Sequence, residues 1–383
     1  MSHKPLNPFL PTIIDEIKSS PIYTRFLRLL AEYGITSIYD THAHISSGRE
    51  GIIEGSPPEL VPRHPFSVGD VNYLYDELFR REGIEFTSVV FDTPLPAYDL
   101  AGKNYQLLNL LKTGDSEDWR KVVPFAVITP DMDYREIQHW VHLGAKGFKM
   151  TPRTASSHVK RGVISDITLA EMLSPEALWV ADLHSLPLVV HLPQLVVSPR
   201  MKPSLKDELL RIVAKFPHLK IILAHLGQAQ APAKMDNLLQ FLERYHLYES
   251  IWMDISAVTV PSVLEMALES KARLLFGTDI DFSLVERGRY VMFKIVDGER
   301  VLAEGDDKGN LITALVSQNF GQKLNPFVLK AGVELDAPLL VFQFEGILVA
   351  VERLQKKGLP EERIKAALEN LFFRNAEQVA KRD

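Results

Sequence analysis

Short apolar runs alternate with amphipathic stretches along most of the chain. From residue 35 onward, eight apolar runs have the length and residue types of buried strands: 35–38, 87–91, 122–129, 147–150, 188–191, 220–225, 251–255 and 273–277. Between them, apolar residues recur at helical spacing at 70–81, 105–112, 134–143, 175–185, 204–216, 238–245 and 262–270. Strands that alternate with helices pair in parallel. The pattern therefore predicts an α/β fold, a (β/α)8 or TIM barrel.

The end of the first strand argues against the alternative, an open doubly wound sheet. Such a sheet normally carries a glycine-rich turn for phosphate directly after its first strand. In this chain the corresponding position holds Asp40-Thr41-His42-Ala43-His44. We therefore expect the barrel.

Two segments lie outside the barrel pattern. Residues 7–33 place apolar side chains at helical spacing, so we expect residues 1–36 to form an N-terminal helical extension and residues 37–383 to form the barrel. After the eighth strand, an insertion at about 282–342 carries two apolar runs that flank Asp297-Gly298, a hairpin signal. We expect this insertion to be a lid, a wall of a substrate pocket or a dimer contact, with a surface hairpin as the alternative.

The composition narrows the possible partners and ligands. The 383 residues carry a formal net charge of −6, so no basic field favours nucleic acid or an anionic membrane. No apolar run is long enough to cross a bilayer, and the N-terminus lacks the apolar core of a signal peptide, so we expect a cytoplasmic protein. There are no cysteines, which excludes disulfides, thiolate ligands and a cysteine nucleophile.

Polar residues stand at or near the ends of several predicted strands. His42 and His44 are two residues apart, so on a strand they project from one face and could grip one divalent metal ion. Four more polar side chains follow later strands: Lys149, His191, His225 and Asp279. The carboxyl ends of barrel strands meet at one mouth. Histidine and carboxylate ligands there suit zinc, manganese or iron.

Other candidate groups have plainer interpretations. Asp254 ends the seventh strand, and we expect it to orient a neighbour or to cap a loop. Four loop arginines are either solvated or recognise a substrate carboxylate: Arg49, Arg63, Arg153 and Arg161. The remaining histidines are expected at the surface or at caps: His3, His64, His139, His142, His158, His184, His218 and His246.

Five stretches together resemble the amidohydrolase superfamily. They are Asp40-Thr41-His42-Ala43-His44, Gly144-Ala145-Lys146-Gly147-Phe148-Lys149, Val190-His191, Ala224-His225-Leu226-Gly227 and Gly277-Thr278-Asp279. The chain is most similar to the amidohydrolase-2 branch, which includes aminocarboxymuconate-semialdehyde decarboxylase and related hydrolases and hydratases. The resemblance covers roughly residues 37–281 and continues from residue 346 to the end. Each motif is loose by itself, and their common order and spacing make the resemblance specific.

The resemblance implies a set of roles for these residues. The metal ligands would be His42, His44, His191 and Asp279. His225 would hydrogen-bond the metal-bound water or a substrate oxygen, and Asp279 would also accept a proton from that water. Lys149 would either bind the substrate or, as a carbamate, bridge two metals. We expect one ion rather than two, with zinc first and manganese or iron as alternatives.

The resemblance also implies an enzyme. We expect a hydrolase that attacks the carbonyl of a lactone, ester or amide in a small, carboxylated substrate. The alternatives are a metal-dependent, non-oxidative decarboxylase or hydratase of an unsaturated or aromatic acid, a lyase reaction, and uronate-isomerase-like chemistry. A non-catalytic binding barrel is a further alternative. The partner would be a small-molecule substrate, and we expect a homodimer.

Overall fold

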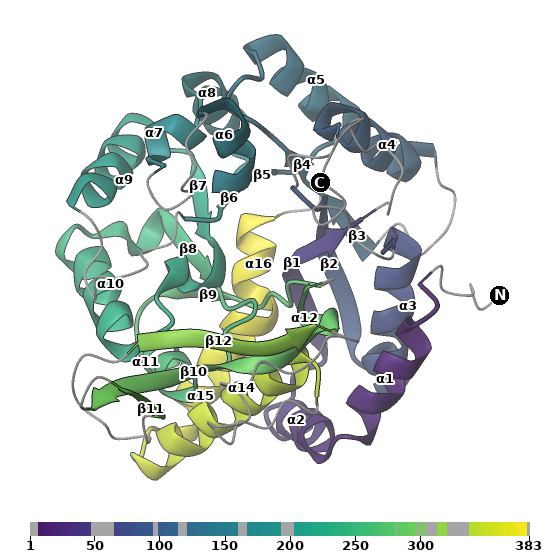
Figure 1. The fold of residues 1–383 in the computed structure, drawn as a ribbon, viewed down its shortest axis with the longest axis vertical. Helices are drawn as coiled ribbons and strands as arrows, with labels where there is room; N and C mark the ends of the chain where they lie inside the picture. The colour runs from purple at the N-terminus through teal and green to yellow at the C-terminus, as the bar shows by residue number, and fades with distance from the viewer. Residues whose placement is uncertain are drawn as a thin grey trace.

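The parallel strands of the protein stand in a ring, and helices surround them (Figure 1). The computed structural model describes residues 7–46, 65–94, 99–113, 121–159, 167–192, 203–280, 282–296, 299–302, 312–319 and 337–380. Within these residues, no helix is both long enough and apolar enough to cross a membrane.

The ring consists of two parallel ladders. The first runs in the order β1 (Ser37–Ile45), β2 (Glu85–Asp92) and β3 (Val122–Pro124). The second runs β4 (Ala126–Val127), β5 (Phe148–Met150), β6 (Pro187–Val190), β7 (Lys220–Leu223), β8 (Ile251–Asp254) and β9 (Arg273–Leu275). Their strands follow one another in chain order, as alternating strands and helices require.

Backbone hydrogen bonds join the two ladders at both seams. Only Phe125 separates β3 from β4, and its N–H donates to Val90 of β2 at 2.9 Å. At the other seam, the N–H of Thr41 in β1 donates to the carbonyl of Phe276 at 2.8 Å, just beyond β9. A parallel bridge between Ala43 and Ile280 extends this contact. The predicted α/β barrel is therefore confirmed.

Helices cover the outside of the ring (Figure 1). In chain order they include α3 (Val68–Leu78), α4 (Leu100–Thr113), α5 (Tyr134–Leu143), α6 (Pro152–Val159), α7 (Leu169–Met172), α8 (Pro175–Leu183), α9 (Pro203–Lys215), α10 (Pro232–Arg244) and α11 (Pro261–Glu269). Local sequence sets their starts: Asp133 caps α5 by accepting the N–H of Glu136, and Ser174 caps α8 by accepting that of Ala177.

The N-terminal segment forms two helices, whereas the apolar spacing suggested one. They are α1 (Leu10–Ser19) and α2 (Pro21–Glu32). The break falls at Ser20, which is extended and whose hydroxyl caps the N–H of Ile22, and Pro21 takes the first helical position. The rings of Phe26 in α2 and Phe344 in α14 (Leu339–Lys356) stack at 4.2 Å. The division at residue 36 stays a prediction.

The segment after the eighth strand contains a separate antiparallel sheet. After a short helix, α12 (Phe282–Val285), β10 (Glu286–Val296) pairs with β11 (Glu299–Leu302) and with β12 (Ile312–Asn319). The expected hairpin is thus confirmed, although Asp297 and Gly298 themselves lie outside the described residues. β12 is an addition that the sequence pattern did not predict.

The C-terminal segment ends against the barrel at the end where the strands begin, through its last turns. Its last elements are α15 (Glu361–Glu369), a π-helical turn (Asn370–Arg374) and α16 (Asn375–Val379), which lies in the centre of Figure 1. Near the start of β1, the Tyr39 hydroxyl donates to the carbonyl of Ala380 at 3.0 Å. At the start of β7, the Lys220 ammonium donates to the carbonyl of Gln378 at 3.2 Å. The opposite end of the barrel, where the strands end, carries the predicted site residues.

Candidate metal centre

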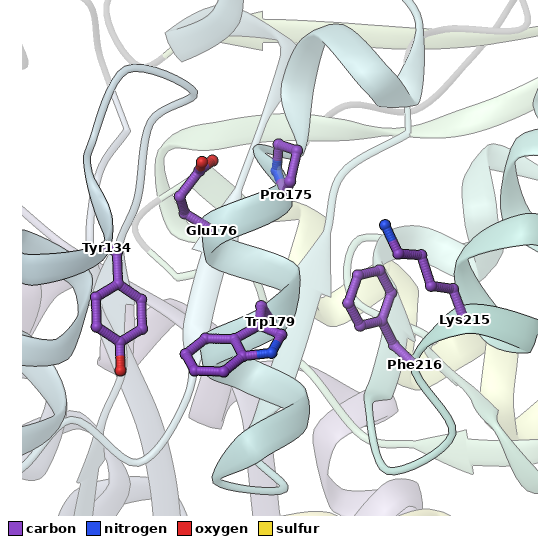
Figure 2. Close-up of a pocket in the computed structure, with 6 residues that line it drawn as sticks. All are labelled: Tyr134, Pro175, Glu176, Trp179, Lys215 and Phe216. Carbon is purple, nitrogen blue, oxygen red and sulfur yellow. The ribbon is translucent and has the colours of Figure 1, made fainter.

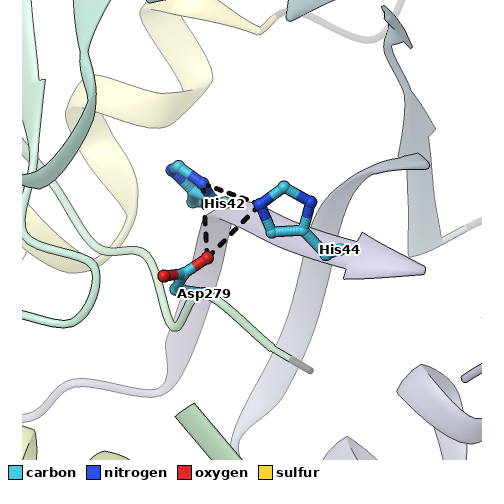
Figure 3. A group of neighbouring side chains, drawn as sticks. All are labelled: His42, His44 and Asp279. Atoms are coloured by element: carbon cyan, nitrogen blue, oxygen red, sulfur yellow. Dashed lines mark hydrogen bonds and ion pairs between the residues drawn. The ribbon is translucent and has the colours of Figure 1, made fainter. Parts of the chain in front are cut away.

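Three side chains converge where β1 meets the loop after β9. The Nε2 atoms of His42 and His44 lie 3.3 Å apart. The Oδ1 atom of Asp279 lies 3.3 Å from Nε2 of His44 and 3.6 Å from Nε2 of His42 (Figure 3). The potential ligand atoms of these residues all fall within 4.8 Å of one another. The alternation of β1 therefore turns both histidines toward one carboxylate.

The hydrogen-bond partners of His42 show that this set fits a cation. Its Nδ1 lies 2.9 Å from Oδ2 of Asp254, a carboxylate oxygen that can only accept. Nδ1 therefore carries the hydrogen, and Nε2 presents its lone pair to the cluster. The Lys149 ammonium already donates to this lone pair at 3.0 Å. Two imidazoles and a carboxylate form a ligand set that divalent metals prefer.

Asp279 is held in place by unusual backbone geometry. Its φ is 56°, and its N–H donates to the carbonyl of His42 at 2.7 Å. The preceding Gly277 makes this approach possible, since a Cβ there would lie 2.9 Å from the Cβ of His42. Burial alone would raise the pKa of Asp279, but the hydrogen bond from His44 and the nearby imidazoles outweigh it and hold that pKa well below its usual range. The carboxylate is therefore ionised.

Burial sets the charge of the neighbouring basic groups. It lowers the pKa of His42 to about 3, and the charge of Lys149 adds to this effect. Burial also lowers the pKa of Lys149 to about 8, against the opposing attraction of Asp254 and Asp279. The Lys149 ammonium lies 4.8 Å from the centre of the Phe91 ring. Lys149 thus lines the same site as the three candidate ligands.

His191 and His225 form a second, adjacent group. Nε2 of His225 lies 3.2 Å from Nδ1 of His191, and the rings of His225 and His42 have centroids 5.0 Å apart. Burial, followed by the neighbouring His225, lowers the pKa of His191 well below its usual value. His191 lies outside the three-residue cluster. Its role as a fourth ligand therefore stays a prediction, as does the role of His225.

Asp254 links the two groups, as expected of a residue that orients a neighbour. While Oδ2 accepts from His42, Oδ1 accepts the N–H of His225 at 3.0 Å. Burial opposes its charge, but the contacts with His42 overcome that penalty and hold the pKa of Asp254 below its usual range. The Ser256 hydroxyl lies 2.9 Å from Nδ1 of His225 and 3.2 Å from Nδ1 of His42.

Sequence reasoning did not identify Ser256, or Gln228, whose amide Nε2 lies 3.1 Å from Nε2 of His191. A serine or glutamine in a loop carries no pattern that distinguishes it from a solvated residue. A signal existed only for Asp254, which ends a strand.

The predicted arginines remain outside this description. Arg49, Arg63 and Arg161 fall outside the described residues, and Arg153 lies exposed on α6. A separate pocket lies on the outer helices, where Trp179 of α8 stands between Tyr134 of α5 and Phe216 (Figure 2). None of the predicted site residues lines that pocket.

Comparison with known proteins adds to this picture. The family model of the amidohydrolases matches residues 39–305, more than half of the chain. No curated protein sequence matches the chain.

Three solved structures are similar to the chain over much of its length. A probable 2-pyrone-4,6-dicarboxylic acid hydrolase from Acinetobacter baumannii, with citric acid bound, has 13% identity and a TM-score of 0.49, covering 89% of this chain and 98% of the other. A 5-carboxyvanillate decarboxylase from Sphingomonas paucimobilis has 12% identity and a TM-score of 0.48, and the match covers 91% of this chain and 100% of the other. A dihydroxybenzoic acid decarboxylase from a Polaromonas species, with bound manganese and the inhibitor 2-nitroresorcinol, has 16% identity and a TM-score of 0.42. The match covers 64% of this chain and 87% of the other.

Proposed function

Because the chain belongs to the amidohydrolase family, whose members are metal-dependent enzymes, we propose that it is a hydrolase of a lactone, ester or amide. The substrate would be small and carboxylated. The observation that carries this proposal is the convergence of His42, His44 and Asp279. One zinc ion is the proposed occupant, with manganese or iron as alternatives, and His191 is proposed as a fourth ligand.

The residues of the chain divide the chemistry among them. A divalent ion bound at this site would supply activated water at neutral pH and would polarise a carbonyl. Asp279 is ionised, and its proposed role is to accept a proton from the water and pass it to a leaving group. If Nε2 of His225 exchanges its contact with His191, it would accept a hydrogen bond from the activated water, and Lys149 would pair with a substrate carboxylate. These roles are proposals that follow from the positions of the side chains.

Lys149 also favours a second candidate function. A cation that lies against the ligands and the Phe91 ring could hold a carboxylate directly at the site. Non-oxidative decarboxylation and hydration of an unsaturated acid both act on a carboxylic acid, so a cation that holds the substrate carboxylate would serve either reaction. The histidine at position 42 tilts the proposal toward hydrolysis, since some decarboxylase relatives carry glutamate there. Release of CO2 would identify the decarboxylase, and release of acid from a lactone or amide would identify the hydrolase.

Metal content is the direct test of the proposal. Plasma mass spectrometry on protein purified without chelator should find about one equivalent of zinc or manganese in the wild type and little in the His42→Ala/His44→Ala variant. His142→Ala, which removes an exposed histidine from α5, is the matched control and should keep the metal. Equal metal content in all three proteins would contradict the assignment of the ligands.

Three further expectations remain proposals. We propose a homodimer in the cytoplasm, and we propose that the β10–β12 sheet is a lid, a pocket wall or a dimer contact. Removing this sheet and measuring activity and oligomeric state would separate a dimer contact from a lid or a pocket wall. A variant that keeps both its activity and its oligomeric state would identify the sheet as a surface decoration.

A further inference from the structure

The four residues after β7 and Ala224 form one left-handed turn. The φ angles of His225, Leu226, Gly227 and Gln228 are 54°, 52°, 59° and 64°. Three of them are not glycine, so the turn is strained and must be held by its surroundings. Leu226 is fully buried, and the N–H of His225 is bound to Asp254. The result is that His225 and Gln228 both contact His191.

Donors and acceptors along this chain of contacts can be assigned in one direction. Nδ1 of His225 lies 2.9 Å from the backbone carbonyl of Ser256, which only accepts, so Nδ1 carries the hydrogen. With neutral rings, Nε2 of His225 is then bare and accepts from Nδ1 of His191 at 3.2 Å. Nε2 of His191 is bare in turn, and it accepts from the Gln228 amide at 3.1 Å. Every group in the chain is satisfied.

Both nitrogens of His191 are therefore engaged, and its one lone pair is held by Gln228. We propose that Gln228 is a positioning residue that competes with a divalent ion for His191. His191 becomes available as a ligand only when the hydrogen bond from Gln228 is given up. This inference rests on the proposed function, because it requires an ion beside His42, His44 and Asp279.

The test is the zinc affinity of the Gln228→Met variant, measured by competition with a chromophoric chelator. Methionine is similar in length to glutamine but has no N–H to donate. Loss of one competing neutral hydrogen bond predicts zinc affinity about five-fold tighter than in the wild type. In a His191→Ala background the same substitution should leave zinc affinity unchanged.

Two results would overturn the inference while leaving the proposed function intact. One is unchanged or weaker zinc binding in Gln228→Met, and the other is an equal gain in affinity without His191. If the wild type binds no zinc at all, the proposed function fails first and the competition fails with it.

A second readout needs neither zinc nor substrate. In ¹⁵N spectra of chelator-treated protein, with the His191→Ala variant to assign the signal, the hydrogen of His191 should be found on Nδ1. The bare Nε2 signal should shift downfield in Gln228→Met as its hydrogen bond is lost. A hydrogen found on Nε2 of wild-type His191 would refute the assignment of donors and acceptors.

Discussion

Asp40 and Thr278 are joined by two hydrogen bonds inside the barrel. The N–H of Thr278 donates to Oδ1 of Asp40 at 3.1 Å, and its hydroxyl donates to Oδ2 at 2.5 Å. Oδ1 also accepts the N–H of His42 at 2.9 Å, and the Tyr75 hydroxyl donates to Oδ2. One buried carboxylate thus fastens the strand of His42 to the loop of Asp279.

Asp40→Ala should therefore weaken both the fold and the metal site. It leaves the buried N–H groups of His42 and Thr278 without their acceptor and removes the acceptor of the Tyr75 and Thr278 hydroxyls, which still contact each other at 3.1 Å. The loss should cost about 3 kcal/mol of unfolding free energy. Tyr75→Phe is the milder companion, since it removes the hydroxyl that contacts Asp40 and Thr278 but keeps the Asp40 carboxylate with its other donors, and it should cost about 1 kcal/mol. Urea unfolding and zinc affinity would be measured on both variants. Equal losses of stability in the two would show that Asp40 is not the centre of this network.

Lys149→Met should retain about one equivalent of metal. The ammonium donates to the lone pair of His42 and adds positive charge next to the three ligands, so its removal should not weaken the site. His44→Ala, measured in parallel by plasma mass spectrometry, should lose the metal. Two equivalents in the wild type and none in Lys149→Met would instead support a carbamylated lysine that bridges two ions.

Acidification should destabilise the protein once its metal has been removed by a chelator. The pKa of His42 is about 3 in the folded protein and about 6.5 in the unfolded chain. Between pH 6.5 and about 3, the unfolded chain binds a proton at this histidine that the folded protein does not bind. The free energy of unfolding therefore decreases as the pH is lowered through this window. His191, whose pKa is also lowered by burial, contributes in the same direction.

Asp40 acts in the opposite sense. Burial raises its pKa from 3.8 to about 6, against the hydrogen bonds from Thr278 and Tyr75. Between these values the folded protein keeps a proton that the unfolded chain has released, so this group stabilises the fold as the pH falls. Urea unfolding at pH 7, 6 and 5 should therefore show a shallower decline in His42→Asn and a steeper one in Asp40→Asn. Identical slopes in all three proteins would contradict both assignments.

Gln343 offers a test of how the two mouth loops are held together. From α14, its amide Nε2 donates to the carbonyls of Ile255 at 3.0 Å and Gly277 at 2.7 Å. Gln343→Leu leaves two buried carbonyls without this donor and should cost about 2 kcal/mol. Gln343→Glu should cost at least as much, because it faces those carbonyls with a carboxylate. Thermal and urea unfolding would measure both, and a neutral Gln343→Leu would contradict the role.

The sequence predicted the features that depend on period and residue type. Apolar runs located the strands of the barrel, and strand ends pointed to His42, His44, Lys149 and Asp279, which the fold brings together. Ser20-Pro21 is a typical helix start and indicates the break between α1 and α2. The apolar spacing continues on both sides of it, so the pattern alone did not predict the break. Antiparallel β12 was missed because its pairing depends on β10 rather than on its own pattern.

Long-range contacts determined the remainder. Residues 224–225 were expected to continue a strand, yet His225 turns left-handed because Asp254 binds its N–H and the core holds Leu226. Ser256 and Gln228 acquire their positions only through that turn and the loop after β8. No local preference predicts a left-handed leucine, so these contacts were not accessible from one sequence.

The hydrogen bond from Tyr39 to Ala380 has a consequence for how the chain matures on the ribosome. The first barrel strand is made early. Its neighbour Phe276 is made 235 positions after Thr41, and Ala380, which contacts the start of the strand, is made 341 positions after Tyr39. A nascent chain must therefore carry β1 with an open edge through most of its synthesis. His42 and His44 acquire their opposing carboxylate only when this edge closes, so a chain arrested before α16 would be exposed to chaperones and proteases as an unsealed sheet.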